Sequence, residues 1–103
     1  MINLKLFKKI CQLSQPQLFD ILTEFLKKHY DNVIIKEGGY IIAEGQLPVA
    51  LVAHLDTVGQ FPPRDIYHDV EQSILWSPQL LGADDRAGVF AIVKIINDGY
   101  RPY

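Results

Sequence analysis

Residues 48–58 read Pro-Val-Ala-Leu-Val-Ala-His-Leu-Asp-Thr-Val, and this stretch decides the fold. Its first six residues, Pro48 to Ala53, are apolar at every position. Side chains alternate between the two faces of a strand, so an unbroken apolar run is typical of a sheet that is covered on both faces. We therefore expect a buried central strand here, with His54 and Asp56 at its carboxyl end.

Two amphipathic helices are predicted ahead of this strand. Residues 3–13 place apolar side chains at helical spacing, with lysines on the opposite side. Ser14 and Pro16 form a start signal for the second helix, because proline lacks only a donor that the first turn leaves unpaired. One face of this second helix consists of Leu18, Ile21, Leu22, Phe25, Leu26 and His29.

Strand signals lie on either side of the central run. Residues 33–35 and 40–43 follow the two-residue period of a strand and flank Lys36-Glu37-Gly38-Gly39, which predicts a hairpin. Residues 58–69 contain glycine and proline breakers and predict a loop. Residues 70–76 then predict one more strand.

A last helix is predicted for residues 86–97, with Gly99 just beyond its end. The order is therefore helix, helix, hairpin, buried strand, strand and helix. This order predicts an α/β fold, a three-layer domain with a mixed β-sheet and helices on both faces. At 103 residues the chain is expected to be a single domain over residues 1–103.

Charge and hydropathy limit the partners of this domain. The net charge of −2 gives no basic footprint for nucleic acid or for an anionic membrane. Lys5, Lys8 and Lys9 interrupt the apolar residues of the N-terminus, so no signal peptide is predicted. No apolar run approaches the ~20 residues that a membrane span needs. These features predict a cytoplasmic protein.

His54 and Asp56 form the first of two motifs with chemical potential. They are two residues apart, so their side chains share a direction in an extended segment. A carboxylate beside an imidazole accepts one ring N–H and leaves the other ring nitrogen free for a metal. The alternative is a histidine whose ring is satisfied by hydrogen bonds within the protein, next to an aspartate that forms a turn.

The second motif is Gly82-Ala83-Asp84-Asp85-Arg86-Ala87-Gly88, at the start of the last predicted helix. In one interpretation Asp84 or Asp85 caps the helix by accepting N–H groups of its first turn. A cap does not account for both glycines or for the His54 motif upstream. Two adjacent carboxylates also repel each other unless a cation or a helix start compensates them, and a metal would supply that cation.

Together, Ala53-His54-Leu55-Asp56-Thr57 and Leu81 to Gly88 resemble the co-catalytic zinc exopeptidases and amidohydrolases, the tripeptide-aminopeptidase-like metallopeptidases in particular. The resemblance implies a truncated phosphorylase/hydrolase-like zinc peptidase core with two zinc ions. His54 would be a ligand of one zinc, and Asp84 would bridge both. Asp56 would be the catalytic carboxylate that orients the His54 ring. Asp85 follows the bridge, where this family often has a cis peptide bond.

In that family a glutamate pair, an aspartate and a histidine follow the bridging aspartate, and this sequence ends at Tyr103 before any of them. Catalytic zinc takes three protein ligands, so we expect zinc binding by this chain to be weak or absent. The resemblance implies the N-terminal half of a zinc-dependent aminopeptidase-like hydrolase that acts on peptide amide bonds. We expect it to be inactive without a complementing C-terminal fragment.

The alternative is a non-catalytic binding or regulatory module. A sheet that lacks its next strand exposes an unpaired edge, which favours homo-oligomerisation or strand addition by a partner. In this interpretation His54 and Asp84 have no role in binding.

Overall fold

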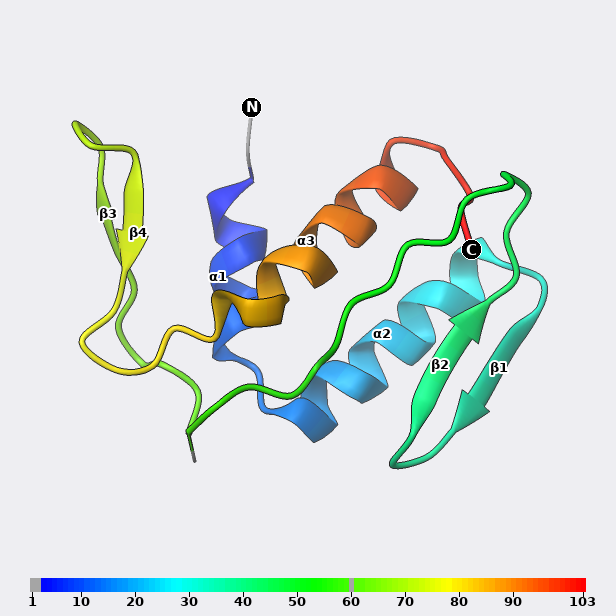
Figure 1. Ribbon diagram of the computed structural model, residues 1–103, viewed down its shortest axis with the longest axis horizontal. Coiled ribbons are helices and arrows are strands. Elements are labelled where there is room, and N and C mark those ends of the chain that lie inside the picture. The colour runs from blue at the N-terminus through cyan, green and yellow to red at the C-terminus, as the bar shows by residue number, and fades with distance from the viewer. Residues whose placement is uncertain (1–2, 60) are drawn as a thin grey trace.

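In the described part of the chain, the fold combines three helices with two small antiparallel sheets, so the α/β class is confirmed. The computed structural model describes residues 3–59 and 61–103. One hairpin lies beside α2 and the other projects from the opposite end of the molecule, while an extended segment crosses the space between α2 and α3 (Figure 1). Gln60, within the predicted loop, lies outside the described residues.

The first two helices begin at side-chain caps. Helix α1 spans Leu4–Gln12, and the Asn3 side chain accepts the Leu6 N–H at its start. Helix α2 spans Gln15–His29 and begins with a capping box. In that box the Ser14 hydroxyl accepts the Gln17 N–H, and the Gln17 side chain accepts the Ser14 N–H. The predicted start at Ser14 is therefore confirmed.

Both sheets are single hairpins. Strands β1 (Val33–Lys36) and β2 (Tyr40–Ala43) pair with Val33 opposite Ala43, as the glycine-containing turn predicted. Strands β3 (Tyr67–Asp69) and β4 (Ile74–Trp76) form the second hairpin. The predicted strand over residues 70–76 is thus too long, because residues 70–73 form the turn of this hairpin.

The segment 48–58 differs from its prediction. It is extended but belongs to neither sheet, and the described residues contain two separate hairpins rather than one mixed sheet. Its burial alternates: Ala53 and Leu55 pack against the core, whereas Val52 is 88% exposed. The prediction of a strand buried on both faces is therefore wrong for the described residues, because only one face has helices packed against it.

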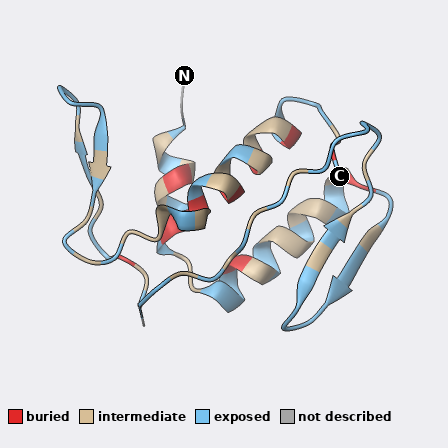
Figure 2. Ribbon diagram, in the orientation of Figure 1, coloured by how far each residue is buried: buried red, intermediate tan, exposed pale blue. Residues whose placement is uncertain are grey.

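The core lies between the helices. Helix α3 (Ala83–Asn97) packs against α1, and the buried cluster consists of Ile10, Leu18, Val89 and Val93 (Figure 2). Gly99 has φ 102° and donates to the Ile96 carbonyl, which ends α3 where the sequence predicted. Among the described residues, no helix has the length and apolar content that crossing a membrane would require.

Candidate metal centre

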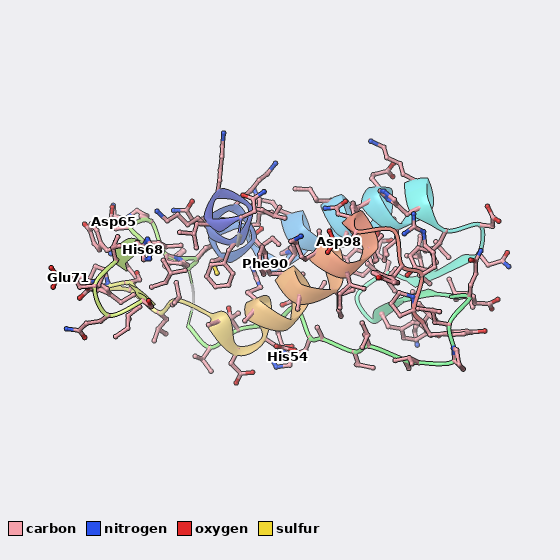
Figure 3. The ribbon with its side chains drawn as sticks, turned by 90° about the horizontal axis from the view of Figure 1, so that it is seen from above. His54, Asp65, His68, Glu71, Phe90 and Asp98 are labelled. Atoms are coloured by element: carbon pink, nitrogen blue, oxygen red, sulfur yellow. The ribbon has the colours of Figure 1, made fainter. Side chains whose placement is uncertain are left out.

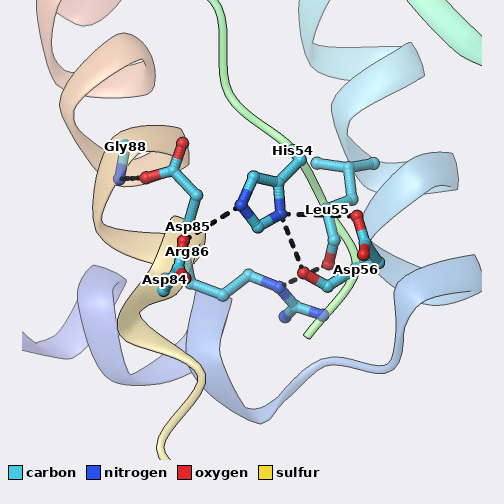
Figure 4. Close-up of polar contacts among 7 residues, drawn as sticks. All are labelled: His54, Leu55, Asp56, Asp84, Asp85, Arg86 and Gly88. Atoms are coloured by element: carbon cyan, nitrogen blue, oxygen red, sulfur yellow. Dashed lines mark hydrogen bonds and ion pairs between the residues drawn. The ribbon is translucent and has the colours of Figure 1, made fainter. Parts of the chain in front are cut away.

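The two predicted motifs meet in space. His54 lies in the extended segment and Asp84 lies thirty residues later, at the start of α3. The Nε2 atom of His54 is 3.0 Å from the Oδ1 atom of Asp84 (Figure 4). Both side chains are open to solvent, with exposed fractions of 51% and 96%. The pair therefore lies at the surface, where a ligand has access.

The other ring nitrogen of His54 faces Asp56. The Nδ1 atom is 3.0 Å from the Asp56 backbone oxygen and 3.3 Å from its carboxylate Oδ1. The backbone oxygen is thus the nearer partner, where the sequence suggested the carboxylate. The Asp56 carbonyl, followed by the Asp84 carboxylate, raises the pKa of His54 above its ordinary value. A proton on Nδ1 is satisfied by Asp56, which directs Nε2 toward Asp84.

Asp84 and Asp85 have different tasks, although they are adjacent. The Asp85 side chain turns away from His54, and its Oδ1 atom accepts the N–H of Gly88 at 3.0 Å (Figure 4). Asp84 and Asp85 have non-helical backbone angles, so the regular turns of α3 begin after Asp85. Asp85 caps those turns, and the cap interpretation holds for this aspartate alone. The peptide bond between Asp84 and Asp85 is cis, as expected from the resemblance. This division of roles leaves the Asp84 carboxylate free to face His54.

Both glycines of the second motif have structural reasons. Gly82 has φ 74°, and a Cβ atom on it would lie 2.9 Å from the Thr57 side chain. The turn before α3 therefore rests directly on the segment that carries His54. A Cβ atom on Gly88 would overlap the Asp85 carboxyl group. The glycines thus allow two close approaches, one between the motifs and one within the cap.

Arg86 joins the two motifs, and the sequence did not indicate its role. It is 3% exposed and donates to three backbone carbonyls: Leu55 at 2.9 Å, Ile10 at 2.6 Å and Leu13 at 2.8 Å. Burial lowers the pKa of Arg86, and no carboxylate among the described residues pairs with it. Because Leu55 lies between His54 and Asp56, Arg86 fixes the distance between the histidine segment and α3.

One feature of the sequence could have indicated that Arg86 has a structural role. It lies three residues before Val89 and seven before Val93, so it occupies the buried face of α3. A charged residue on an otherwise apolar helix face requires internal partners. The identity of those partners depends on the fold and could not be read from the sequence.

Other candidate ligands lie elsewhere. His68 is in β3, and Figure 3 shows it near Asp65 and Glu71, far along the molecule from His54. The Nδ1 atom of His29 is 2.9 Å from the Phe25 carbonyl, and this contact holds the His29 side chain at the end of α2. Among the described residues, no group of three or more His, Cys, Asp or Glu side chains is arranged to hold a metal. His54 and Asp84 are therefore two potential ligands, with Asp56 beside the histidine.

The chain was also compared with protein-family models, curated proteins and solved structures, and none of them matches it.

Proposed function

We propose that this chain is the N-terminal half of a zinc-dependent aminopeptidase-like hydrolase that acts on peptide amide bonds. The observation that supports this proposal is the approach of His54 Nε2 to Asp84 Oδ1 at 3.0 Å. These two side chains come from the two motifs that carry the resemblance to zinc exopeptidases. A cap for α3 alone would need only Asp85, so the position of Asp84 calls for a second explanation.

The donor atoms suit zinc in type and spacing. Nitrogen and oxygen ligands at ~2.1 Å from a tetrahedral zinc lie about 3.4 Å apart. The observed separation of 3.0 Å needs to widen by only a few tenths of an ångström. Asp56 occupies the second ring nitrogen of His54, which is the usual arrangement around a zinc-bound histidine. In this proposal Asp84 would bridge to a second zinc, as the resemblance implies.

Each residue has a task that follows from its contacts. His54 and Asp84 would hold the metal, and Asp56 orients the imidazole. Arg86 keeps the two motifs at a fixed distance, because it donates to the Leu55 carbonyl from the start of α3. When bound, zinc supplies Lewis-acid activation of water and of the substrate carbonyl. Two ligands are fewer than a catalytic zinc takes, so the third ligand and the base would come from residues outside this sequence.

Zinc titration of the metal-stripped chain by calorimetry tests the proposal. We expect weak binding that His54→Ala and Asp84→Ala each reduce by about 10-fold or more, since loss of even an outer partner costs 10- to 100-fold. His68→Ala and Asp31→Ala are matched controls, because both residues are exposed and lie outside the site. In the same calorimetric titration, these control substitutions should change the zinc affinity by less than about twofold.

Two results would overturn the proposal. One is zinc binding that is indifferent to both His54→Ala and Asp84→Ala. The other is the absence of any binding at millimolar zinc in a chain whose circular dichroism shows that it is folded, because two donor atoms already 3.0 Å apart should hold zinc at least weakly.

A further inference from the structure

We propose that the pocket beside Arg86 binds a small monocarboxylate, an organic acid with one carboxylate group and a short apolar body. We call it the Arg86 pocket, and its volume is about 250 Å³. Its polar lining includes the side chains of Ser14, Thr57 and Arg86. The proposed zinc ligands do not line it, so this pocket is separate from the candidate metal centre.

The positive charge of Arg86 has no counter-ion in the described part of the chain. The residue is 3% exposed, and the ion pairs among the described residues involve other side chains. Cys11 is near the guanidinium, but burial raises the pKa of its thiol to about 11, so the thiol is neutral at pH 7. A buried charge without an opposite charge is unfavourable. A bound anion would compensate it.

Two N–H groups of Arg86 remain available to a ligand. Its Nε atom donates to the Leu55 carbonyl, and its Nη1 atom donates to the carbonyls of Ile10 and Leu13. A guanidinium has five N–H donors, so the two on Nη2 are left without an acceptor among the described residues. In that part of the chain, the Thr23 hydroxyl alone is a buried side-chain polar atom without a partner, so Nη2 keeps access to solvent. Because Arg86 lines the pocket, Nη2 is the donor that it offers there.

Two hydroxyl groups of the lining also have donors to offer. The Ser14 hydroxyl oxygen accepts the Gln17 N–H, but its own O–H donates to no described residue. The methyl group of Thr57 faces Gly82, and the Thr57 hydroxyl likewise bonds to no described residue. Nη2 and the two hydroxyls therefore offer four donors, which is about the number that the two oxygens of one carboxylate accept.

The charge of the pocket selects a monoanion. Of the described residues that line it, Arg86 alone is charged, so one negative charge is compensated and a second is not. A phosphate group carries a charge of about −1.5 to −2 at pH 7, which exceeds that of one guanidinium. A carboxylate carries a single negative charge, and it forms strong hydrogen bonds with arginine.

The remaining walls of the pocket select the body of the ligand. They are mostly apolar, with Leu13, Phe61, Pro63, Leu80 and Leu81 among them. Pockets for drug-sized ligands measure roughly 300–1,000 Å³, and this pocket is smaller. An acid with a few carbon atoms therefore fits both the walls and the volume.

The guanidinium is held in place before a ligand arrives. It reaches from α3 to the extended segment, where it donates to the Leu55 carbonyl (Figure 4). Its two other bonds end on Ile10 and Leu13, at the end of α1. Binding therefore does not need to immobilise the arginine side chain, which lowers the entropic cost of association.

Titration of the metal-free full chain with sodium isobutyrate, followed by nuclear magnetic resonance, tests this inference. Isobutyrate replaces chloride at constant ionic strength. We expect saturable shifts of the Arg86 Nε–H and the Thr57 amide, with Kd in the millimolar range. Isobutyramide has the same shape without the charge, so it is the matched control ligand. It should bind at least tenfold more weakly, because it lacks the charge that strengthens the bonds to Arg86.

Variants of the chain test the same contacts. Thr57→Val removes the hydroxyl with little change in shape and should weaken isobutyrate binding about tenfold, through loss of one hydrogen bond to a charged group. Thr23→Val makes the same change outside the pocket and should bind within twofold of the unaltered chain. The two ligands are compared on the unaltered chain, so that comparison remains decisive even if Thr57→Val fails to fold.

Four results would overturn the inference. One is the absence of saturable shifts at Arg86 and Thr57 up to about 0.1 M isobutyrate. The second is equal binding of isobutyramide, which would show that the pocket recognises shape alone. The third is tighter binding of inorganic phosphate, which would assign the pocket to that anion. The fourth is an unchanged affinity in a folded Thr57→Val variant.

The carboxylate measurements contain no zinc, and the zinc titration contains no isobutyrate. Failure of one proposal therefore leaves the other to be judged separately.

Discussion

Replacing Arg86 with methionine should destabilise the fold more than any other single change at the site. The guanidinium is 3% exposed and donates to the carbonyls of Ile10, Leu13 and Leu55. Methionine has a similar length but no donor, so the buried Ile10 carbonyl and the partly buried carbonyls of Leu13 and Leu55 lose this partner. An unsatisfied buried group costs about 1–3 kcal/mol, which sets the expected loss at about 3 kcal/mol or more.

This loss is large for a small domain. Folded proteins of this size unfold with about 5–15 kcal/mol, and each kcal/mol corresponds to about 4–8 °C in Tm. We therefore expect Arg86→Met to lower Tm by about 12 °C or more. Urea unfolding followed by helical circular dichroism measures the free energy directly, since α1, α2 and α3 dominate the signal.

Two further variants make the Arg86 prediction specific. Arg86→Lys keeps the charge but cannot reach three carbonyls in different directions, so it should lose most of the same free energy. Arg64→Met is the surface control, because Arg64 is exposed, and it should change stability by less than about 0.5 kcal/mol. If Arg86→Met and Arg64→Met unfold at the same urea concentration, the structural role given to Arg86 is refuted.

Two other predictions concern the cap and the buried thiol. Gly88→Ala should destabilise α3, because the added Cβ overlaps the Asp85 carboxyl group, although alanine usually favours a helix over glycine by about 1 kcal/mol. In an Asp85→Ala background, the same substitution should instead stabilise the fold. Equal effects of Gly88→Ala in both backgrounds, measured by urea unfolding, would contradict this prediction. Burial raises the pKa of Cys11 to about 11, with the nearby Arg86 lowering it in part. The neutral thiol stabilises the fold fully below the ordinary thiol pKa of 9.0, and this contribution is lost as the pH rises toward 11. Urea unfolding between pH 8 and 11 should therefore show a steeper decline in stability than Cys11→Ala shows, and parallel curves would argue against it.

Local signals in the sequence predicted most elements correctly. Ser14 and Pro16 located the start of α2, and the glycines after Lys36 located the first hairpin. These features depend on contacts within a few residues, which a sequence shows directly. The approach of His54 to Asp84 was implied by the resemblance of the two motifs to zinc exopeptidases, although the segment that carries His54 is not the central strand that was predicted.

The errors concern long-range packing. The apolar run from Pro48 to Ala53 indicated cover on both faces, but α2 and α3 reach only the side of Ala53 and Leu55. The hydrophobicity of a side chain indicates that it tolerates burial, but it does not show which elements of the fold pack against it. The role of Arg86 was missed for the same reason, since the Ile10 carbonyl that it reaches is 76 residues away.

That separation has a consequence for how the chain acquires its structure during synthesis. Helix α1 has nine residues, and an isolated helix of that length is unstable in water. Arg86, which donates to the Ile10 carbonyl near the end of α1, follows Ile10 by 76 residues. A ribosome needs about 4 to 15 s to add that many residues. The bonds from Tyr30 to Pro102 and from Arg101 to His29 each span 72 residues and can form only after those distant residues have been synthesised. The nascent chain therefore spends seconds with its N-terminal helix unanchored, and chaperones that recognise exposed apolar segments can bind it during that interval.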